Sequence, residues 1–472
     1  MITKIAGHRS ILFAFFASIL ILIHLILTLY VISDSSSNFR NKIVQYQETH
    51  ADYTQLSHQI TPHLRINDSK RTLFMNPSEE ANYIMAMNSF YGFGLVEWSQ
   101  TSRDYVSSSK NRITQFLYLL VIKSGFDFDL FIIVVLLVFF LAYVMGIYLV
   151  LSISCLVMSK KMSEFCAISW AAYPSNLLHI GTGFFYENLA VTALLYFTYV
   201  MLRHQQTYMA IRMIICVSLI LVIVGSLRIQ ALFVALISIV ITGFLTKDPL
   251  NKRNMGLVGF TTAILFVLVS IPTLVQNKKD FGEYSFGYQG HYMFWEGANK
   301  LARGSWDGTG LALSNAKSEI LGFEEMDESE LASELMKTSM TWIVHNPIDY
   351  SLLQLRKIGI FFFPTNFESG YFLFQSINPF NLSLHLGLLF VVVIYTLKSL
   401  RCRYFAKRMF LSISRENIVL FLSPVAGSLL LTLTFFVGFR WRFYAEPFML
   451  MAFYYLCSQF YFLNVSRFFR SL

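Results

Sequence analysis

Residues 130–157 read LFIIVVLLVFFLAYVMGIYLVLSISCLV and contain no charged side chain. A helix needs about 20 apolar residues to cross the hydrocarbon core of a bilayer, and this run exceeds that length. Because lipid offers no hydrogen-bond partners, a chain that crosses it is helical or forms a closed barrel. The run therefore predicts a transmembrane helix. It ends at Lys160 and Lys161, a basic loop of the kind that stays on the cytoplasmic side.

The composition of the whole chain agrees with this run. Hydrophobic residues make up 55% of the sequence and charged residues 14%. We therefore expect an all-α polytopic membrane protein and not a soluble domain. The formal net charge of +9 comes from Lys and Arg in short loops between apolar runs, a pattern that orients a membrane protein and requires no nucleic-acid partner.

Similar apolar runs recur along the chain, and basic loops alternate between them to give about ten spans. Lys4, His8 and Arg9 precede the first run and place the N-terminus in the cytoplasm. That run lacks a small-residue cleavage site, so we expect a retained helix and not a signal peptide. The expected spans are 11–32, 130–157, 165–180, 184–202, 209–224, 229–245, 255–275, 380–397, 418–437 and 443–463.

Two long polar segments divide the chain into three parts. Residues 1–275 form an N-terminal transmembrane module with a first outer loop at 33–112, residues 276–377 form a second outer loop, and residues 378–472 carry the C-terminal transmembrane helices. In the second loop, 329–345 has helical apolar spacing and Asn346-Pro347 ends it. Residues 348–363 combine Leu352, Leu355 and Ile358 with basic residues, which favours a helix lying along the membrane surface.

Ionisable residues collect at the outer ends of the expected spans. Glu187 begins the fourth span, and Arg228 lies in the short turn after the fifth. Arg440, Arg442 and Glu446 lie where the last span begins. Arginine on outer turns opposes the usual orientation bias and is costly near lipid, so these positions indicate a function. We expect all five to line a substrate-binding site.

Each of these residues also has a purely structural interpretation. Arg228 can extend to lipid phosphates, and Glu187 can stabilise the start of its helix. Arg442 and Glu446 are four residues apart and can form an ion pair within one helix.

Further candidates come from the two outer loops. In the second, Trp295 and Asn299 follow the seventh span and are candidate substrate-binding residues, although Trp295 is also a typical interfacial anchor. In the first, Glu79 and Glu80 stand at a predicted helix start, where carboxylates also complement the helix dipole. Tyr83 shares a helical face with Glu79. Carboxylates act as general bases, and arginines bind phosphate.

Four short stretches carry a resemblance to a known family. They are the acidic pair with its tyrosine at 79–83, Tyr-Pro-Ser at 173–175 followed by Glu187, the segment 346–357, and the arginine-rich stretch 439–447. With these stretches the chain resembles the GT-C superfamily of polyprenyl-phosphate-dependent membrane glycosyltransferases. Within it, the bacterial protein-mannosyltransferase-like and aminoarabinose-transferase-like enzymes are the most similar. The resemblance implies a role in cell-envelope polysaccharide biosynthesis or protein glycosylation.

The resemblance implies an inverting transfer of a sugar from a polyprenyl-phosphate carrier to a lipid, glycan or protein acceptor. The enzyme would be a multi-pass protein of the inner (plasma) membrane, surrounded by membrane lipids, with its active site facing the periplasm or exterior. Glu79 would be the catalytic base and Glu80 the second choice. The family usually has Asp at the first position of the pair, where this chain has Glu79. A divalent metal serves some members, and no ligand set for one is recognisable in this sequence.

The same resemblance distributes the remaining roles. Arg440, Arg442 and Arg228 would stabilise the departing phosphate, while Tyr83 and Glu187 would position acceptor or carrier.

Two alternatives stay open. An O-antigen polymerase or ligase would consume diphosphate-linked oligosaccharides. A lipid-linked sugar transporter would carry ionisable residues near the middle of the membrane.

Overall fold

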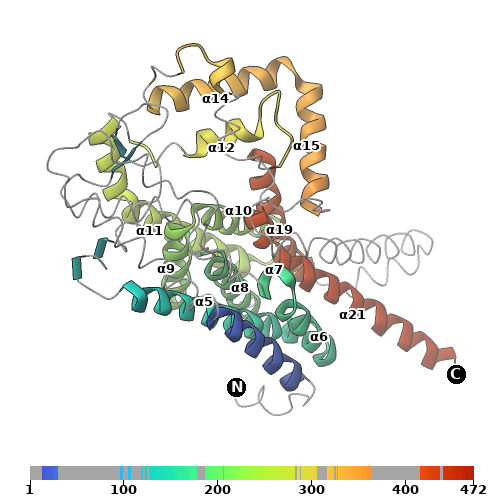
Figure 1. The fold of residues 1–472 in the computed structure, drawn as a ribbon. Helices are drawn as coiled ribbons and strands as arrows, with labels where there is room; N and C mark the ends of the chain where they lie inside the picture. Colours follow the sequence, from blue (N-terminus) through green and yellow to red (C-terminus); the bar gives the residue numbers. More distant parts are fainter. Residues whose placement is uncertain are drawn as a thin grey trace.

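The computed structural model shows a predominantly helical chain, with a group of helices at one end of a larger helical bundle (Figure 1). It describes residues 13–29, 96–98, 105–107, 119–120, 123–124, 128–177, 186–205, 207–281, 284–286, 289–305, 316–323, 326, 328–362, 415–435 and 439–471. Three helices are long and apolar enough to cross a membrane, and they contain Ile133–Val157, Pro249–Val275 and Glu416–Thr434. Shorter apolar helices cover Phe13–Leu29, Ile211–Leu227 and Ile229–Leu245. The predicted helical, membrane-associated class is confirmed at this level.

The apolar helices pack into one bundle. From the first part of the chain come α5 (Phe128–Val157), α6 (Lys160–Ala171), α7 (Pro174–Leu177), α8 (Glu187–Arg203), α9 (Ile211–Leu227), α10 (Ile229–Leu245) and α11 (Pro249–Phe281). The C-terminal part adds α19 (Arg415–Thr434), α20 (Phe439–Phe443) and α21 (Glu446–Ser471). The helix Phe13–Leu29 lies beside α5, where the rings of His24 and Tyr143 stack with centroids 3.7 Å apart.

Close backbone approach fixes the centre of the bundle, where α10 packs along α19. A side chain at Gly427 of α19 would lie 3.0 Å from the Val234 backbone oxygen of α10, so glycine permits the contact. The Thr242 hydroxyl donates to the Ser423 hydroxyl across the same interface at 3.0 Å. On the outside of the bundle, large apolar side chains are exposed, including Phe244 at 81% and Ile211 at 76%. Exposed apolar surface of this extent suits contact with lipid.

The span expected at 165–180 is interrupted. Helix α6 ends at Ala171, and α7 begins at Pro174. Proline at the first helical position loses no hydrogen bond, because that N–H has no partner within the helix. The carbonyl of Ala171 accepts the Tyr143 hydroxyl at 2.8 Å, and the Trp170 carbonyl accepts Asn176 Nδ2 at 3.0 Å. Side chains thus satisfy carbonyls that the end of α6 leaves open.

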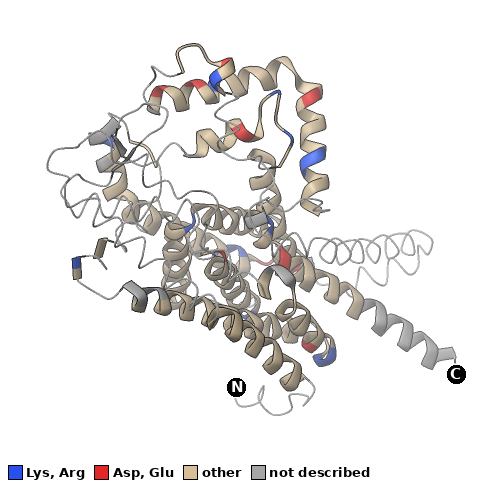
Figure 2. Ribbon diagram, in the orientation of Figure 1, with Lys and Arg blue, Asp and Glu red and all other residues tan. Residues whose placement is uncertain are grey.

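A second layer, here named the α12–α15 segment, contains α12 (Gln289–Gly297), α14 (Glu328–His345) and α15 (Pro347–Phe362). It lies at one end of the bundle (Figure 1) and has its own small hydrophobic core. Acidic and basic residues gather on these helices and are sparse along the bundle helices (Figure 2). The core residues of this layer are Trp295, Ala316, Ile320, Phe323, Leu331 and Leu335.

The break predicted at Asn346-Pro347 is confirmed. Helix α14 ends at His345, and the Asn346 side chain donates to the Trp342 carbonyl at 3.0 Å. In α15 the face that contains Leu352 and Leu355 is exposed, at 59% and 63%. Whether it lies along a membrane surface remains a prediction.

One departure from the all-α prediction occurs in the first polar segment. Strands β1 (Val96–Trp98) and β2 (Tyr105–Ser107) form an antiparallel pair in which Glu97 lies opposite Val106. Every other element of the described residues is helical. The span expected at 380–397 lies outside the described residues.

Candidate functional site

A buried ion pair joins two predicted site residues, Glu187 and Arg228. Arg228 ends α9 and precedes α10 in an extended conformation, with φ −144° and ψ 95°. Its Nε lies 3.5 Å from Glu187 Oε1, and the two side chains are 17% and 1% exposed. The guanidinium also lies 5.9 Å from the centre of the Tyr186 ring. The tight turn therefore brings the arginine to the start of α8, where Glu187 also complements the helix dipole.

A second buried ion pair joins Arg442 and Glu446. Arg442 Nε donates to Glu446 Oε1 at 3.0 Å, and the side chains are 3% and 0% exposed. Arg442 lies in α20 and Glu446 is the first residue of α21. A turn joins the two helices, because Ala445 N donates to the Arg442 carbonyl at 2.8 Å. The structure thus contains the ion pair that the four-residue spacing allows.

The helices that carry Glu187 and Arg442 are in contact, because α20 packs against α8. Tyr173, at the break between α6 and α7, is near enough to be affected by the charges of both Arg442 and Glu446. The Trp170 ring lies 5.9 Å from the Tyr173 ring and 5.8 Å from the ring of Phe443. An aromatic group of Trp170, Tyr173 and Phe443 therefore lies next to the second pair.

The electrostatics of this site follow from the burial of its charges. Each carboxylate is matched by a guanidinium, so neither pair carries net charge. An ion pair removed from water persists only if both partners stay together, since loss of one leaves an uncompensated charge. The pairs therefore fix the orientation of two guanidiniums. Arginine carries five N–H donors in a planar arrangement that suits phosphate oxygens.

No protein-family model, curated protein or solved structure matches this chain. The chemistry of the site must therefore be argued from its own residues.

The remaining predicted site residues are placed as follows. Glu79, Glu80 and Tyr83 lie outside the described residues. Arg440 belongs to α20, and its side chain is not among those described. The proximity of the acidic pair to the arginine-rich turn therefore stays a prediction.

Trp295 and Asn299 belong to the packing of the α12–α15 segment. The Trp295 side chain is 1% exposed and lies in the core of that segment. Asn299 Nδ2 donates to the Trp295 carbonyl at 2.6 Å, and its Oδ1 accepts Leu301 N at 2.7 Å. Both residues thus have structural contacts, and their assignment to substrate binding remains a prediction.

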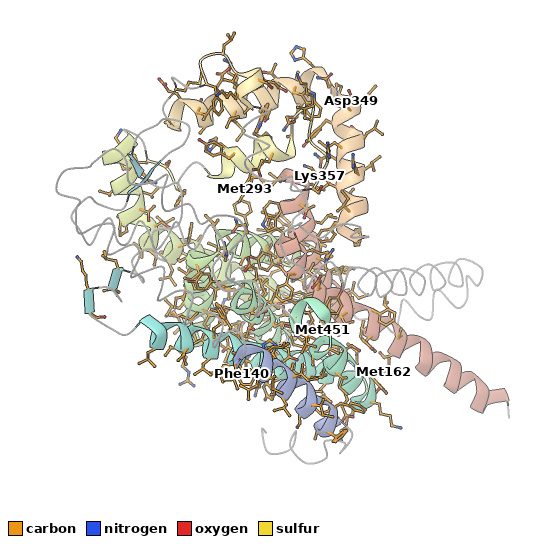
Figure 3. The ribbon with its side chains drawn as sticks, in the orientation of Figure 1. Phe140, Met162, Met293, Asp349, Lys357 and Met451 are labelled. Atoms are coloured by element: carbon orange, nitrogen blue, oxygen red, sulfur yellow. The ribbon has the colours of Figure 1, made fainter. Side chains whose placement is uncertain are left out.

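A buried lysine near the site was not expected from the sequence. Lys357 of α15 is 0% exposed, and its Nζ donates to the carbonyls of Leu433, at 3.0 Å, and Phe435 at the end of α19 (Figure 3). Burial lowers its pKa to about 7. The pattern did contain a signal, because Leu353 and Phe361 lie four residues to either side and are buried on the same face.

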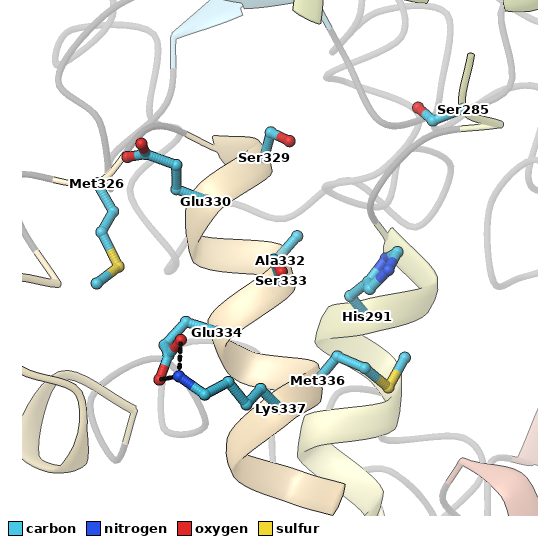
Figure 4. Close-up of a pocket in the computed structure, with 10 residues that line it drawn as sticks. All are labelled: Ser285, His291, Met326, Ser329, Glu330, Ala332, Ser333, Glu334, Met336 and Lys337. Atoms are coloured by element: carbon cyan, nitrogen blue, oxygen red, sulfur yellow. Dashed lines mark hydrogen bonds and ion pairs between the residues drawn. The ribbon is translucent and has the colours of Figure 1, made fainter. Parts of the chain in front are cut away.

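A separate cavity of about 980 Å³ lies between α12 and α14 (Figure 4). It is lined by polar side chains that include His291, Glu330 and Glu334. Lys337 borders it and pairs with Glu334 at 3.0 Å. None of the predicted catalytic or substrate-binding residues lines this cavity.

Proposed function

We propose that the protein is an inverting membrane glycosyltransferase with about ten spans, which moves a sugar from a polyprenyl-phosphate carrier to an acceptor on the outer face. The observation that carries the proposal is the pairing of Arg228 with Glu187 and of Arg442 with Glu446, where α8 and α20 are in contact. Three regions that are far apart in the sequence supply these charges: the start of α8, the α9–α10 turn, and the turn between α20 and α21. Packing does not require buried charged groups, so their presence is typical of a functional site.

The chemistry divides between carboxylate and guanidinium groups. Glu79 takes the proton of the acceptor hydroxyl as its oxygen attacks the anomeric carbon. The bond between that carbon and the phosphate oxygen breaks, and polyprenyl phosphate leaves with the bonding electrons. Displacement from the opposite face inverts the anomeric configuration, through an oxocarbenium-like transition state. Arg442 and Arg228 stabilise the negative charge that develops on the departing phosphate.

Orientation is the contribution of the two ion pairs. Glu446 accepts a hydrogen bond from Nε of Arg442. The two terminal nitrogens of that guanidinium lie farther along the side chain than Nε. A guanidinium held by a carboxylate needs little reorganisation when phosphate charge develops, which is how preorganised donors accelerate a reaction. The described residues contain no group of three or more His, Cys, Asp or Glu that could hold a metal ion.

The location of the buried charges favours transfer over transport. Among the described residues the buried Asp, Glu, Lys and Arg side chains are Glu187, Lys357, Arg442 and Glu446. His24 is also buried, and its ring stacks on Tyr143 and contacts the Leu177 carbonyl oxygen through Nδ1. Glu187 and Glu446 each begin a helix, Arg442 lies in the short α20, and Lys357 lies in α15 outside the candidate spans. A transport pathway would call for ionisable groups along the middle of the spans.

Transfer of labelled sugar from a synthetic polyprenyl-phosphate sugar by the purified protein in detergent tests the proposal. Glu79→Gln and Arg442→Ala should each lower kcat by at least about 100-fold, the size expected for loss of a base or a phosphate donor. Glu164→Gln is the matched control. Glu164 forms an ion pair with Lys160, four residues earlier, and the Lys160 side chain is 53% exposed. Full activity of Glu79→Gln would remove Glu79 as the base.

The choice of donor separates this enzyme from a polymerase or ligase. The same assay is run with a diphosphate-linked oligosaccharide in place of the monophosphate-linked sugar. Transfer from the diphosphate donor alone would refute the proposed reaction and establish the alternative. Turnover of neither donor, by protein that unfolds cooperatively, would refute both.

A further inference from the structure

Asn188, the residue after Glu187, differs from the other buried asparagines of the described chain. Its side chain is 3% exposed, its Oδ1 has no hydrogen-bond partner, and its amide takes part in no hydrogen bond of the described residues. Every other buried asparagine described donates a hydrogen bond through Nδ2. These residues are Asn176, Asn251, Asn254, Asn277 and Asn299.

The position of Asn188 connects it with the Glu187–Arg228 pair. It lies in the first turn of α8, four residues before Thr192 and on the same helical face. The Thr192 hydroxyl contacts the backbone carbonyls of Asn188 and of Ala142 in α5. This face of α8 is therefore directed toward α5, next to the ion pair.

A second unpartnered polar atom lies on the Arg228 side of the pair. Ser226, two residues before Arg228, is 4% exposed, and its Oγ has no hydrogen-bond partner. Polar groups removed from water normally find partners, because leaving them unsatisfied destabilises the folded state. One such group follows Glu187 directly in the sequence and the other precedes Arg228 by two residues. We infer that a ligand supplies the missing hydrogen bonds.

The unsatisfied atoms restrict the chemistry of that ligand. The oxygens of a bound phosphate ester only accept hydrogen bonds. They therefore cannot donate a hydrogen bond to an amide oxygen. A hydroxyl group both donates and accepts, and it matches an amide and a serine at once. The carboxylate of Glu187 also accepts from hydroxyl groups. The combination fits a polyhydroxylated ligand, while arginine is the partner for phosphate.

We propose that Asn188 and Ser226 bind hydroxyl groups of the sugar beside the Glu187–Arg228 pair. The identity of the ligand as the sugar of a lipid-linked donor rests on the proposed function. The assignment of Asn188 as a ligand-binding residue rests only on its burial and its unsatisfied amide. Two experiments test these parts separately.

Thermal unfolding of the purified protein in detergent tests the first part without any ligand. Asn188→Ala removes an unsatisfied amide and should unfold within about 2 °C of wild type or above it. Asn254→Ala is the matched control, because Asn254 is 1% exposed and donates to the carbonyls of His204 and Thr207. It should unfold at a clearly lower temperature. An equal loss in the two variants would overturn the proposal, because Asn188 would then be a structural residue.

Binding of two synthetic probes tests the second part. Wild-type protein should bind a short-chain polyprenyl-phosphate sugar more tightly than the same polyprenyl phosphate without sugar. Asn188→Ala should reduce this preference about tenfold while binding of the bare phosphate stays unchanged. A preference that survives in Asn188→Ala overturns the sugar assignment. Failure of wild type to bind either probe refutes the proposed function, and the unfolding result still decides whether Asn188 has a structural role.

Discussion

Replacing Lys357 by Met removes the buried amino group that joins α15 to the end of α19 through hydrogen bonds. The Lys357 side chain is fully buried, and its Nζ donates to the carbonyls of Leu433 and Phe435. No ion pair of the described residues includes Lys357. Its amino group instead forms hydrogen bonds with carbonyls at the end of α19. Met keeps the length of the aliphatic stem and loses only the ammonium group.

The magnitude follows from the pKa of Lys357, which burial lowers from 10.5 to about 7. Each pKa unit corresponds to about 1.4 kcal/mol. Below pH 7 the protonated lysine therefore lowers the free energy of unfolding by up to about 5 kcal/mol. Between pH 7 and 10.5 the unfolded chain binds more protons than the folded one, so stability rises with pH by up to about 1.4 kcal/mol per unit. Above pH 10.5 this contribution no longer changes.

The assay is unfolding in detergent at several pH values from 7 to 9.5, for wild type and Lys357→Met. Other titrating groups cancel in the difference between the two proteins. We expect that difference to change by about 2–3 kcal/mol across the range, with the variant lacking the stabilisation that wild type gains as pH rises. Lys337→Met is the control, because the Lys337 side chain is 72% exposed, and its curve should run parallel to wild type. Parallel curves for Lys357→Met would refute the reasoning.

Two further predictions concern contacts near the same site. Arg442→Met should lower the free energy of unfolding by about 3–5 kcal/mol, because it strands the buried carboxylate of Glu446, and adding Glu446→Leu should recover most of the loss; equal losses in the single and double variants, measured by unfolding, would contradict this. Gly297→Ala should strongly destabilise the protein, because the added Cβ would overlap the Phe435 carbonyl oxygen. Gly290→Ala, with nothing within 4 Å of its added Cβ, should be tolerated in the same measurement.

Local signals in the sequence predicted the elements of the α12–α15 segment well. The proline at 347 ended α14 within one residue of the expected place, since proline restricts the residue before it. The four-residue spacing of Arg442 and Glu446 allowed their ion pair to be anticipated. In both cases the interacting groups lie within a few residues of each other. Apolar length likewise predicted the three helices that are long enough to cross a membrane.

Tertiary contacts were harder to anticipate. The sequence placed Glu187 and Arg228 on the same side of the membrane, but their pairing depends on how α8 packs beside the α9–α10 turn. In α15 the apolar stripe read from the sequence, with Leu352 and Leu355, is exposed, while the buried face carries Lys357. A lysine on a buried face is stable only when a partner exists, and its partner is the end of a helix 76 residues away.

The contacts of Lys357 indicate why the α12–α15 segment and the arginine-rich turn belong together. Gly297 brings the end of α12 against the Phe435 backbone, and Lys357 holds the same carbonyl from α15. The ring of Phe435 meets Trp441 of α20 with centroids 5.7 Å apart, and Arg442 is the next residue. Helices α12 and α15 of the α12–α15 segment thus both contact Phe435, which precedes the arginine-rich turn. Since packed contacts of this kind have few alternative arrangements, the α12–α15 segment helps to hold the turn that carries Arg442, while the ion pair with Glu446 orients its guanidinium.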